Sequence, residues 1–226
     1  MIYVYRQASS TGARQLAEAL EGVRARNARQ MGRVREGDVV VYWGDFLPTR
    51  AGVVKLNAGQ VLNKVSELRR LREQDVPTVE FGSRPVPGQE WLGRTADHTG
   101  GLDLLQPPAR PDFWVRKEAL VRELRVHSFK GRSIRAGLKV PREGWAPNPP
   151  AGSTAKVAHP WIRSWDGGWR IAYSGQGVKQ KHRDLAHAAT AAMGLDFGAV
   201  DIGERADGTL VVLEVNRAPG LEGGTI

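Results

Sequence analysis

The hydrophobic positions at the start of the chain predict a strand, a helix and a second strand. Residues 2–5 form a short run of strand-favouring residues, and Ser9 or Ser10 can cap the helix that follows. Residues 38–44 are nearly all apolar, as in strands that are buried within a parallel sheet. We therefore expect residues 1–57 to form a small unit of the strand–helix–strand (βαβ) type.

Helical spacing returns after residue 58. A helix is predicted by hydrophobic residues that recur three or four positions apart, namely Val61, Val65, Leu68 and Leu71. The dipeptide Asn63-Lys64 stands near the start of this helix. Short strands are then predicted at 76–81, 91–95 and 111–117. We treat residues 58–117 as a second unit.

Residues 118–226 predict a third unit. The segment 123–127 alternates strictly, which places Glu123, Arg125 and His127 on one face of a strand. The elements expected after it are a strand at 132–140, a loop at 141–152, a hairpin of 161–163 with 169–173, and a helix at 182–193. The hairpin would turn at 166–168, and the helix would end at Gly194.

A last pair of strands is predicted on either side of Asp207-Gly208. This dipeptide is a strong signal for a two-residue hairpin loop, because a type I′ turn needs positive φ at both central positions. In that register Asp201 lies directly opposite Glu214, and Asn216 points to the same face.

This register brings like charges together. Carboxylates directly across a ladder, roughly 4.5–5.5 Å apart, destabilise the pair. A bound divalent cation would remove that effect, and two carboxylates with an amide oxygen form a hard, all-oxygen site suited to Mg²⁺. The alternative is an exposed hairpin edge on which Asp201 and Glu214 face water.

The residues after the hairpin favour the metal site. The motif Glu214-Val215-Asn216 runs into Pro219-Gly220, so the strand stops at a turn beside the acidic face. This pattern resembles the ATP-grasp carboxylate–amine ligases, whose last core strand carries E-x-N followed by a Pro-Gly turn. The resemblance is closest to the small ligase-like ATP-grasp proteins of bacteriophages. The ligases that add glutamate to a ribosomal protein tail are similar to a lesser degree.

The resemblance implies an α/β (α+β) ATP-grasp fold. Two subdomains, 58–117 and 118–226, would clamp ATP between antiparallel sheets, and the unit 1–57 would precede them. The implied cofactors are ATP and Mg²⁺, with Mn²⁺ as the alternative metal. The residues in the metal-binding positions are Asp201, Glu214 and Asn216.

Contacts to the ATP phosphates are implied at the entry to the lid. The order Asn-Lys, helix, Val-Pro-Thr resembles the family's lid entry, where the lysine, here Lys64, contacts phosphate. Arg94 stands where the family more broadly has lysine. The pair Gly100-Gly101 would let backbone N–H groups approach phosphate oxygens, and His98 is a further candidate. Without the resemblance, an exposed lysine and a plain glycine turn would be expected.

The adenine, the ribose and the reacting groups have implied partners too. The backbone of three residues at the end of the lid should hydrogen-bond the adenine: Trp114, Val115 and Arg116. By resemblance Glu123 binds the ribose hydroxyls, Arg125 faces the phosphates or the acyl-phosphate, and Lys139 is a further active-site cation. The pattern alone would favour an amphipathic strand with a solvated charged face.

Net charge adds little to this choice. The formal charge is +9 and the isoelectric point is near 10.2, a balance common among nucleic-acid-binding proteins. No helix-turn-helix, zinc-finger or RNA-binding signature is found, and the basic residues are scattered along the chain. ATP and an acidic peptide would be equally suitable anionic partners.

The sequence also limits the compartment. It has no cysteine, which excludes disulfides and cysteine-based metal sites. No apolar run approaches the roughly 18–20 residues that span a membrane, and the start lacks a signal-peptide pattern. We expect a cytoplasmic protein without membrane contact, located in the host cytoplasm if it is phage-encoded.

The implied activity is ligation with ADP release. A substrate carboxylate would attack the γ-phosphate of ATP, and an amine would then displace phosphate to form an amide or peptide bond. The carboxylate and amine substrates would be small molecules or peptides. The alternatives are a degenerate ATP-binding protein and a basic nucleic-acid-binding protein. Where related ligases often have an active-site asparagine, this sequence has Ser164-Trp165.

Overall fold

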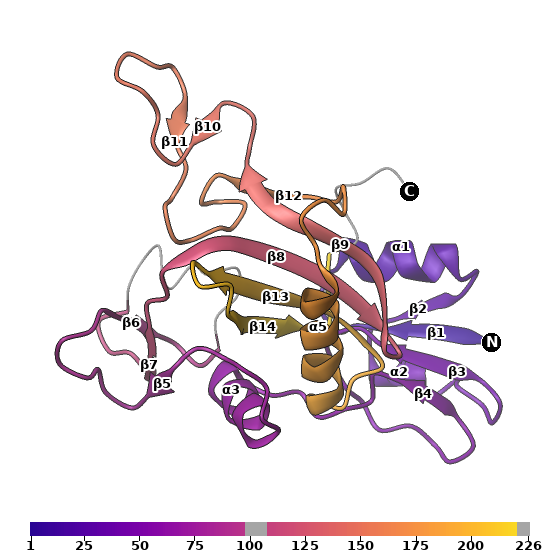
Figure 1. Cartoon of the computed structure of the whole chain (residues 1–226). Coiled ribbons are helices and arrows are strands. Elements are labelled where there is room, and N and C mark those ends of the chain that lie inside the picture. The colour runs from indigo at the N-terminus through magenta and orange to yellow at the C-terminus, as the bar shows by residue number, and fades with distance from the viewer. Residues whose placement is uncertain (98–107, 221–226) are drawn as a thin grey trace.

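Four parallel strands form the N-terminal sheet in the computed structural model, which describes residues 1–97 and 108–220 (Figure 1). The strands are β1 (Ile2–Tyr5), β2 (Val23–Ala25), β3 (Val39–Tyr42) and β4 (Val54–Leu56), in the order β2-β1-β3-β4. Ser10, not Ser9, caps α1 (Thr11–Ala19), and a short α2 (Ala28–Met31) follows β2. The predicted strand–helix–strand start is confirmed, and it is extended by two further strands.

Three antiparallel strands form a second sheet. They are β5 (Phe81–Gly82), β6 (Trp91–Arg94) and β7 (Phe113–Arg116), with β7 in the centre. The preceding helix, α3 (Lys64–Glu73), begins after Asn63, whose side chain accepts the Ser66 N–H. Val61 lies before the helix and is exposed, so the predicted helical face starts one turn too early.

The prediction of a strand over 76–81 is largely wrong. Only Phe81 belongs to a strand, and Thr78 forms an isolated bridge to Val212. The Val212 N–H donates to the Pro77 carbonyl over 2.8 Å, and the Thr78 hydroxyl donates to the Val212 carbonyl over 2.9 Å. This segment therefore covers the outer edge of β14, which would otherwise present unpaired backbone groups.

Five antiparallel strands form the third sheet, in the order β12-β9-β8-β13-β14. Their bounds are β8 (Leu120–Phe129), β9 (Arg132–Pro141), β12 (Trp169–Ala172), β13 (Phe197–Arg205) and β14 (Leu210–Asn216). Helix α5 (Gln180–Ala192) packs across one face of this sheet (Figure 1), and Gly194 follows it with a φ of 64°. The face opposite α5 remains to form a site.

Strand alternation divides the two faces of the third sheet. Val126, Val200 and Ile202 belong to the apolar core that includes alanines of α5. Leu71 of α3 joins the same core, whereas Leu68 packs in a second core with residues of the three-stranded sheet. Helix α3 therefore contacts both antiparallel sheets.

The predicted hairpin of 161–163 with 169–173 is wrong. Residues 161–163 are not a strand, and β12 pairs with β9 instead. The glycines at 167 and 168 do form a tight turn, because the Trp169 N–H donates to the Ser164 carbonyl over 2.9 Å. The tight turn at Asp166-Gly167-Gly168 was thus predicted correctly, but the strand that pairs with β12 was not.

The predicted loop 141–152 contains a two-residue strand. Strand β10 (Trp145–Ala146) pairs in parallel with β11 (Lys156–Val157). Together they form an arm that stands out from the body of the molecule beyond β12 (Figure 1).

A buried asparagine joins the N-terminal sheet to the third sheet. The Asn57 side chain donates to the Phe197 carbonyl over 2.9 Å and accepts the Phe197 N–H over 2.9 Å. Trp43 packs against the Phe197 ring at 5.3 Å between centroids. Within the described ranges, no helix is both long enough and apolar enough to cross a membrane.

Candidate active site between the two antiparallel sheets

The loop between β13 and β14 is one residue longer than predicted. The Arg205 N–H donates to the Thr209 carbonyl, and the Gly208 N–H donates to the Arg205 carbonyl, both over 2.9 Å. Gly208 has a φ of 80°, whereas Asp207 does not have positive φ. The loop therefore comprises residues 206–208, a type I turn followed by a left-handed glycine. The predicted two-residue type I′ turn is wrong.

A β-bulge restores the predicted register. Near the loop, Ile202 pairs with Val212. The next pair joins Asp201 to Glu214, which leaves Leu213 as an extra residue on β14. The extra bulge residue compensates for the extra loop residue. Asp201 and Glu214 therefore lie directly opposite one another, as the sequence predicts.

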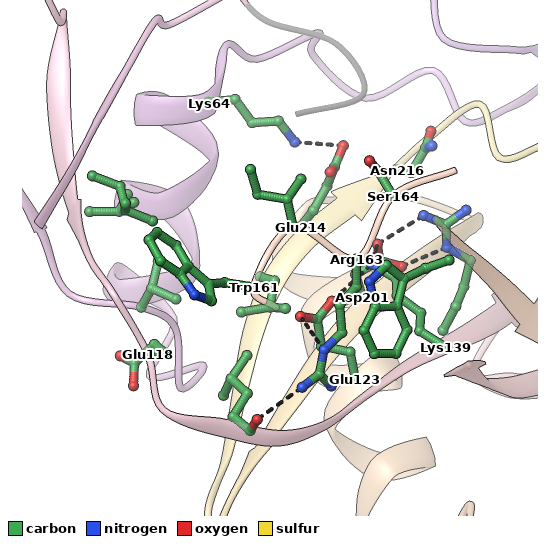
Figure 2. Close-up of a pocket in the computed structure, with 18 of the residues that line it drawn as sticks. Lys64, Glu118, Glu123, Lys139, Trp161, Arg163, Ser164, Asp201, Glu214 and Asn216 are labelled. Atoms are coloured by element: carbon green, nitrogen blue, oxygen red, sulfur yellow. Dashed lines mark hydrogen bonds and ion pairs between the residues drawn. The ribbon is translucent and has the colours of Figure 1, made fainter. Parts of the chain in front are cut away.

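A pocket of about 960 Å³ opens over this pair, between the three-stranded and five-stranded sheets (Figure 2). The basic side chains that line it are Lys64, Arg94, Arg116, Lys117, Arg125, Lys139, Arg163 and Arg170. The acidic ones are Glu118, Glu123, Asp201 and Glu214. Because basic side chains outnumber acidic ones, the pocket favours an anionic ligand.

Asp201 is buried and bound by two cations. The Arg125 guanidinium donates to both carboxylate oxygens, over 2.6 and 2.8 Å, and Lys139 Nζ lies 2.9 Å from Oδ2. Burial opposes the ionisation of Asp201, but the two cations outweigh it and hold its pKa well below the ordinary value. Asp201 is therefore a carboxylate at neutral pH.

Glu214 has its own cation. Lys64, the first residue of α3, places Nζ 2.7 Å from Glu214 Oε1, while the Glu214 side chain keeps 40% of its surface exposed. The neighbouring Glu67 accepts the Val215 N–H over 2.7 Å, and burial raises the pKa of Glu67 to about 7. The sequence analysis missed Glu67, although its place in the first turn of α3 was a signal.

Lys139 also connects Asp201 to Glu123. Its Nζ lies 3.0 Å from Glu123 Oε2, and the Arg163 guanidinium approaches Glu123 Oε1 at 3.7 Å. Burial would lower the pKa of Lys139, but Asp201 and Glu123 outweigh burial and raise it. The structure therefore brings Glu123, Arg125, Lys139 and Asp201 together on one face.

Asn216 completes a set of hard oxygen donors. It ends β14 two residues after Glu214 and lines the same pocket. Its Oδ1 accepts the Ala218 N–H over 2.9 Å, and a carbonyl oxygen retains a second lone pair. The described residues contain no group of three or more His, Cys, Asp or Glu that could hold a metal. Two carboxylates and one amide oxygen fit Mg²⁺ better than a soft or imidazole-binding metal.

The predicted adenine contact lies on a strand whose backbone is already paired. Trp114 and Val115 pair with strands on both sides, and the Arg116 N–H donates to the Glu80 carbonyl over 2.8 Å. A central antiparallel strand uses its backbone groups in both neighbouring ladders. The connection 117–119 lies outside both sheets and is better placed for such a contact.

The remaining predicted residues are divided between the pocket and its surroundings. Lys64 and Arg94 line the pocket. His98, Gly100 and Gly101 lie outside the described residues. His127 is buried and does not line the pocket, but its Nε2 lies 3.0 Å from the hydroxyl of Tyr173, which does.

Sequence reasoning missed the wall formed by residues 161–173. Trp161, Arg163 and Tyr173 all line the pocket, and so does Ser164, which stands where an asparagine was expected. Figure 2 shows Trp161 on the Glu118 side of the pocket and Ser164 on the Asn216 side. The interspersed tryptophans and arginines were a signal of a binding surface, but their location depends on the pairing of β12 with β9.

No protein-family model matches this sequence, and no curated protein does. Solved structures do match it. The ATP-grasp ligase PsnB complexed with a minimal precursor has a TM-score of 0.61 and 16% identity, over 96% of this chain and 90% of PsnB. The chain has the fold of the ATP-grasp ligases.

A second ligase gives the same result. D-alanine–D-alanine ligase from Bacillus anthracis has a TM-score of 0.63 and 12% identity, over 98% of this chain and 87% of that ligase. PsnB has also been solved with a precursor peptide and AMPPNP, with a TM-score of 0.61 and 14% identity, over 96% of this chain and 88% of PsnB. At these identities the ATP-grasp likeness concerns the fold, so the reaction has to be argued from the pocket.

Proposed function

We propose that this protein is an ATP- and Mg²⁺-dependent carboxylate–amine ligase that forms an amide bond and releases ADP. The observation that carries the proposal is the Asp201–Glu214 pair, with Asn216, at one end of a basic pocket between two antiparallel sheets. The proposed relatives are the small phage-encoded ATP-grasp proteins, and the proposed location is the cytoplasm. We also propose that the chain is organised in three units, 1–57, 58–117 and 118–226. Helix α3 belongs to the second unit and packs on both antiparallel sheets.

Asp201, Glu214 and Asn216 would hold Mg²⁺, which neutralises phosphate charge when bound. In the structure, the two carboxylates are bound by Arg125, Lys139 and Lys64. We assign Lys64 and Arg125, together with Arg94, to phosphate oxygens, and Lys139 to the active site as a further cation. Binding of Mg²⁺ with ATP would pair the two carboxylates with the metal and the basic side chains with phosphate oxygens.

The rest of the nucleotide would extend toward the hinge. Backbone groups in 117–119 would contact the adenine, and apolar side chains such as Leu92, Val115 and Leu213 would flank it. Glu123 would accept hydrogen bonds from the ribose hydroxyls, after its contacts with Lys139 and Arg163 rearrange.

The reaction needs positioning and charge neutralisation rather than a side-chain nucleophile. A substrate carboxylate oxygen attacks the γ-phosphorus, and the bond to the oxygen that bridges to ADP breaks. The amine then attacks the acyl carbon, inorganic phosphate leaves, and the amine proton passes to solvent or phosphate. Arg125 and Lys139 lie beside Asp201, where they can bind the transferred phosphoryl group.

The test combines thermal shift with ADP release. Mg²⁺-ATP should raise the melting temperature of the wild type, and a screen of amino acids and peptides should find one mixture that accelerates ADP formation. Glu214→Ala should lower that rate by about 100-fold or more, because it removes a metal ligand. Glu18→Ala, at an exposed position of α1, is the matched control. ADP formation by Glu214→Ala at the wild-type rate in saturating Mg²⁺ would contradict the proposal.

A further inference from the structure

Two of the seven tryptophans are exposed, and both line the pocket. Trp161 has 46% and Trp165 has 62% of its surface accessible, and they lie on the same segment. Large aromatic side chains that remain exposed together at the mouth of a pocket are typical of binding surfaces. Neither side chain is needed for the core.

Each exposed tryptophan already carries a cation on one face. Lys117 Nζ lies 3.4 Å from the centre of the Trp161 ring, and the Arg142 guanidinium lies 3.9 Å from the centre of the Trp165 ring. Arg142 also donates to the Trp165 carbonyl over 3.3 Å. Since Arg142 covers one face of Trp165, the large exposed area belongs to the rest of the ring, which is open to a ligand.

Trp165 lines the pocket, on the segment that crosses it. The segment runs from Trp161 on the Glu118 side to Ser164 on the Asn216 side (Figure 2), and Trp165 is the next residue. Arg170 is exposed and lines the same pocket. Arg142, Trp165 and Arg170 together form a surface that we name the cationic tryptophan surface.

This surface is held in place by the base of the arm. The Arg142 N–H donates to the Gly168 carbonyl over 2.9 Å, and the Gly168 N–H donates to the Trp165 carbonyl over 3.0 Å. Gly168 has a φ of 87°, and a Cβ there would lie 2.2 Å from the Trp145 ring. Trp145 of β10 therefore packs directly on the backbone that presents Trp165, and the surface is preorganised.

We propose that the cationic tryptophan surface binds an acidic peptide that supplies the substrate carboxylate, an inference that rests on the proposed ligase function. A ligand with several carboxylates complements Arg142 and Arg170, and its apolar atoms can cover the Trp165 ring. A free amino acid at the phosphate end would leave Arg142 and most of Trp165 uncovered. A peptide that leaves the pocket beside Trp165 covers both.

The test measures binding of fluorescein-labelled hexaglutamate by anisotropy, with and without saturating Mg²⁺-AMPPNP. Hexaglutamate should bind, and hexalysine should not. Trp165→Ala, Arg142→Gln and Arg170→Gln should each weaken hexaglutamate binding, by up to about tenfold for Trp165→Ala, and Trp165→Phe should restore most of that loss. Arg29→Gln, at an exposed position of α2, carries the same charge change and should bind like the wild type.

Three results would overturn the proposal. One is hexaglutamate binding that Trp165→Ala, Arg142→Gln and Arg170→Gln all leave unchanged. Another is the absence of hexaglutamate binding by the wild type in both conditions. The third is tighter, steeply salt-dependent binding of single-stranded oligodeoxythymidine, which would indicate a nucleic-acid surface. The Mg²⁺-AMPPNP thermal shift is recorded on the same samples. Its absence from the wild type would contradict the ligase function, whereas its retention with loss of peptide binding in the variants supports the peptide site.

Discussion

Asp201 and Glu204 are two buried carboxylates on the same strand, but they lie in different surroundings. The basic partners are Arg125 and Lys139 for Asp201, and Arg122 and Lys181 for Glu204. Because they are three positions apart on β13, the two side chains point to opposite faces of the sheet. Asp201 faces Glu214 and the pocket, whereas Glu204 faces the first turn of α5, where His182 lies nearby.

The comparison shows that a buried, cation-bound carboxylate does not by itself mark an active site. The pKa of each carboxyl lies below its ordinary value because basic neighbours outweigh burial. What distinguishes Asp201 is a second carboxylate directly opposite and a cavity that can admit a ligand. Leu210 lies opposite Glu204, which does not line the pocket described above, and we assign Glu204 a structural role that ties α5 to the sheet.

The largest expected difference between the two carboxylates is in nucleotide binding. Asp201→Asn should abolish the thermal shift caused by Mg²⁺-ATP, because the proposed metal site loses a charged ligand. Glu204→Gln should keep that shift, since Glu204 lies on the other face of the sheet. Thermal melts of both variants with and without Mg²⁺-ATP measure this. Equal thermal shifts in the two variants, or a thermal shift lost only in Glu204→Gln, would contradict the different roles assigned to Asp201 and Glu204.

A smaller effect is expected in stability and its pH dependence. Burial opposes the ionisation of Glu204, but Lys181 and Arg122 lower its pKa to about 2, from 4.5. Ionised Glu204 therefore stabilises the fold above pH 4.5, and this contribution is lost as the pH falls from 4.5 toward 2. Glu204→Gln should lower the free energy of unfolding by about 1–3 kcal/mol at pH 7.

Urea unfolding of the wild type and Glu204→Gln at a series of pH values checks this prediction. The difference between the two proteins should shrink as the pH falls below 4.5, because other titrating groups are common to both. A difference that stays constant down to pH 3 would exclude the ion pairs as its cause. Glu18→Gln, on the exposed side of α1, should unfold like the wild type at each pH.

The facing pair Asp201–Glu214 could be predicted from sequence, although the turn that was assumed to set its register was wrong. The Asp207-Gly208 signal located the turn, and the loop proved to be one residue longer. Leu213 then forms a bulge that returns Asp201 to its place opposite Glu214. Loop length and bulges depend on tertiary packing, so the sequence alone could not separate them.

The wall formed by residues 161–173 could not be predicted for a different reason. Local turn chemistry correctly indicated a sharp turn at residues 166–168, but β12 pairs with β9, which lies about thirty positions earlier in the chain. Nothing in the local sequence names a partner strand at that separation. Trp161 and Arg163 were therefore assigned to a hairpin instead of the pocket.

The central claim is that Asp201 and Glu214 bind ATP through Mg²⁺, and calorimetric titration of AMPPNP tests it most directly. Wild-type protein should bind AMPPNP at least about tenfold more tightly in Mg²⁺ than in EDTA, a difference of about 1.4 kcal/mol or more. In Glu214→Ala that difference should largely disappear, while the protein remains folded. Wild-type binding that is equally tight in EDTA, or a Mg²⁺ dependence that Glu214→Ala retains in full, would contradict the account.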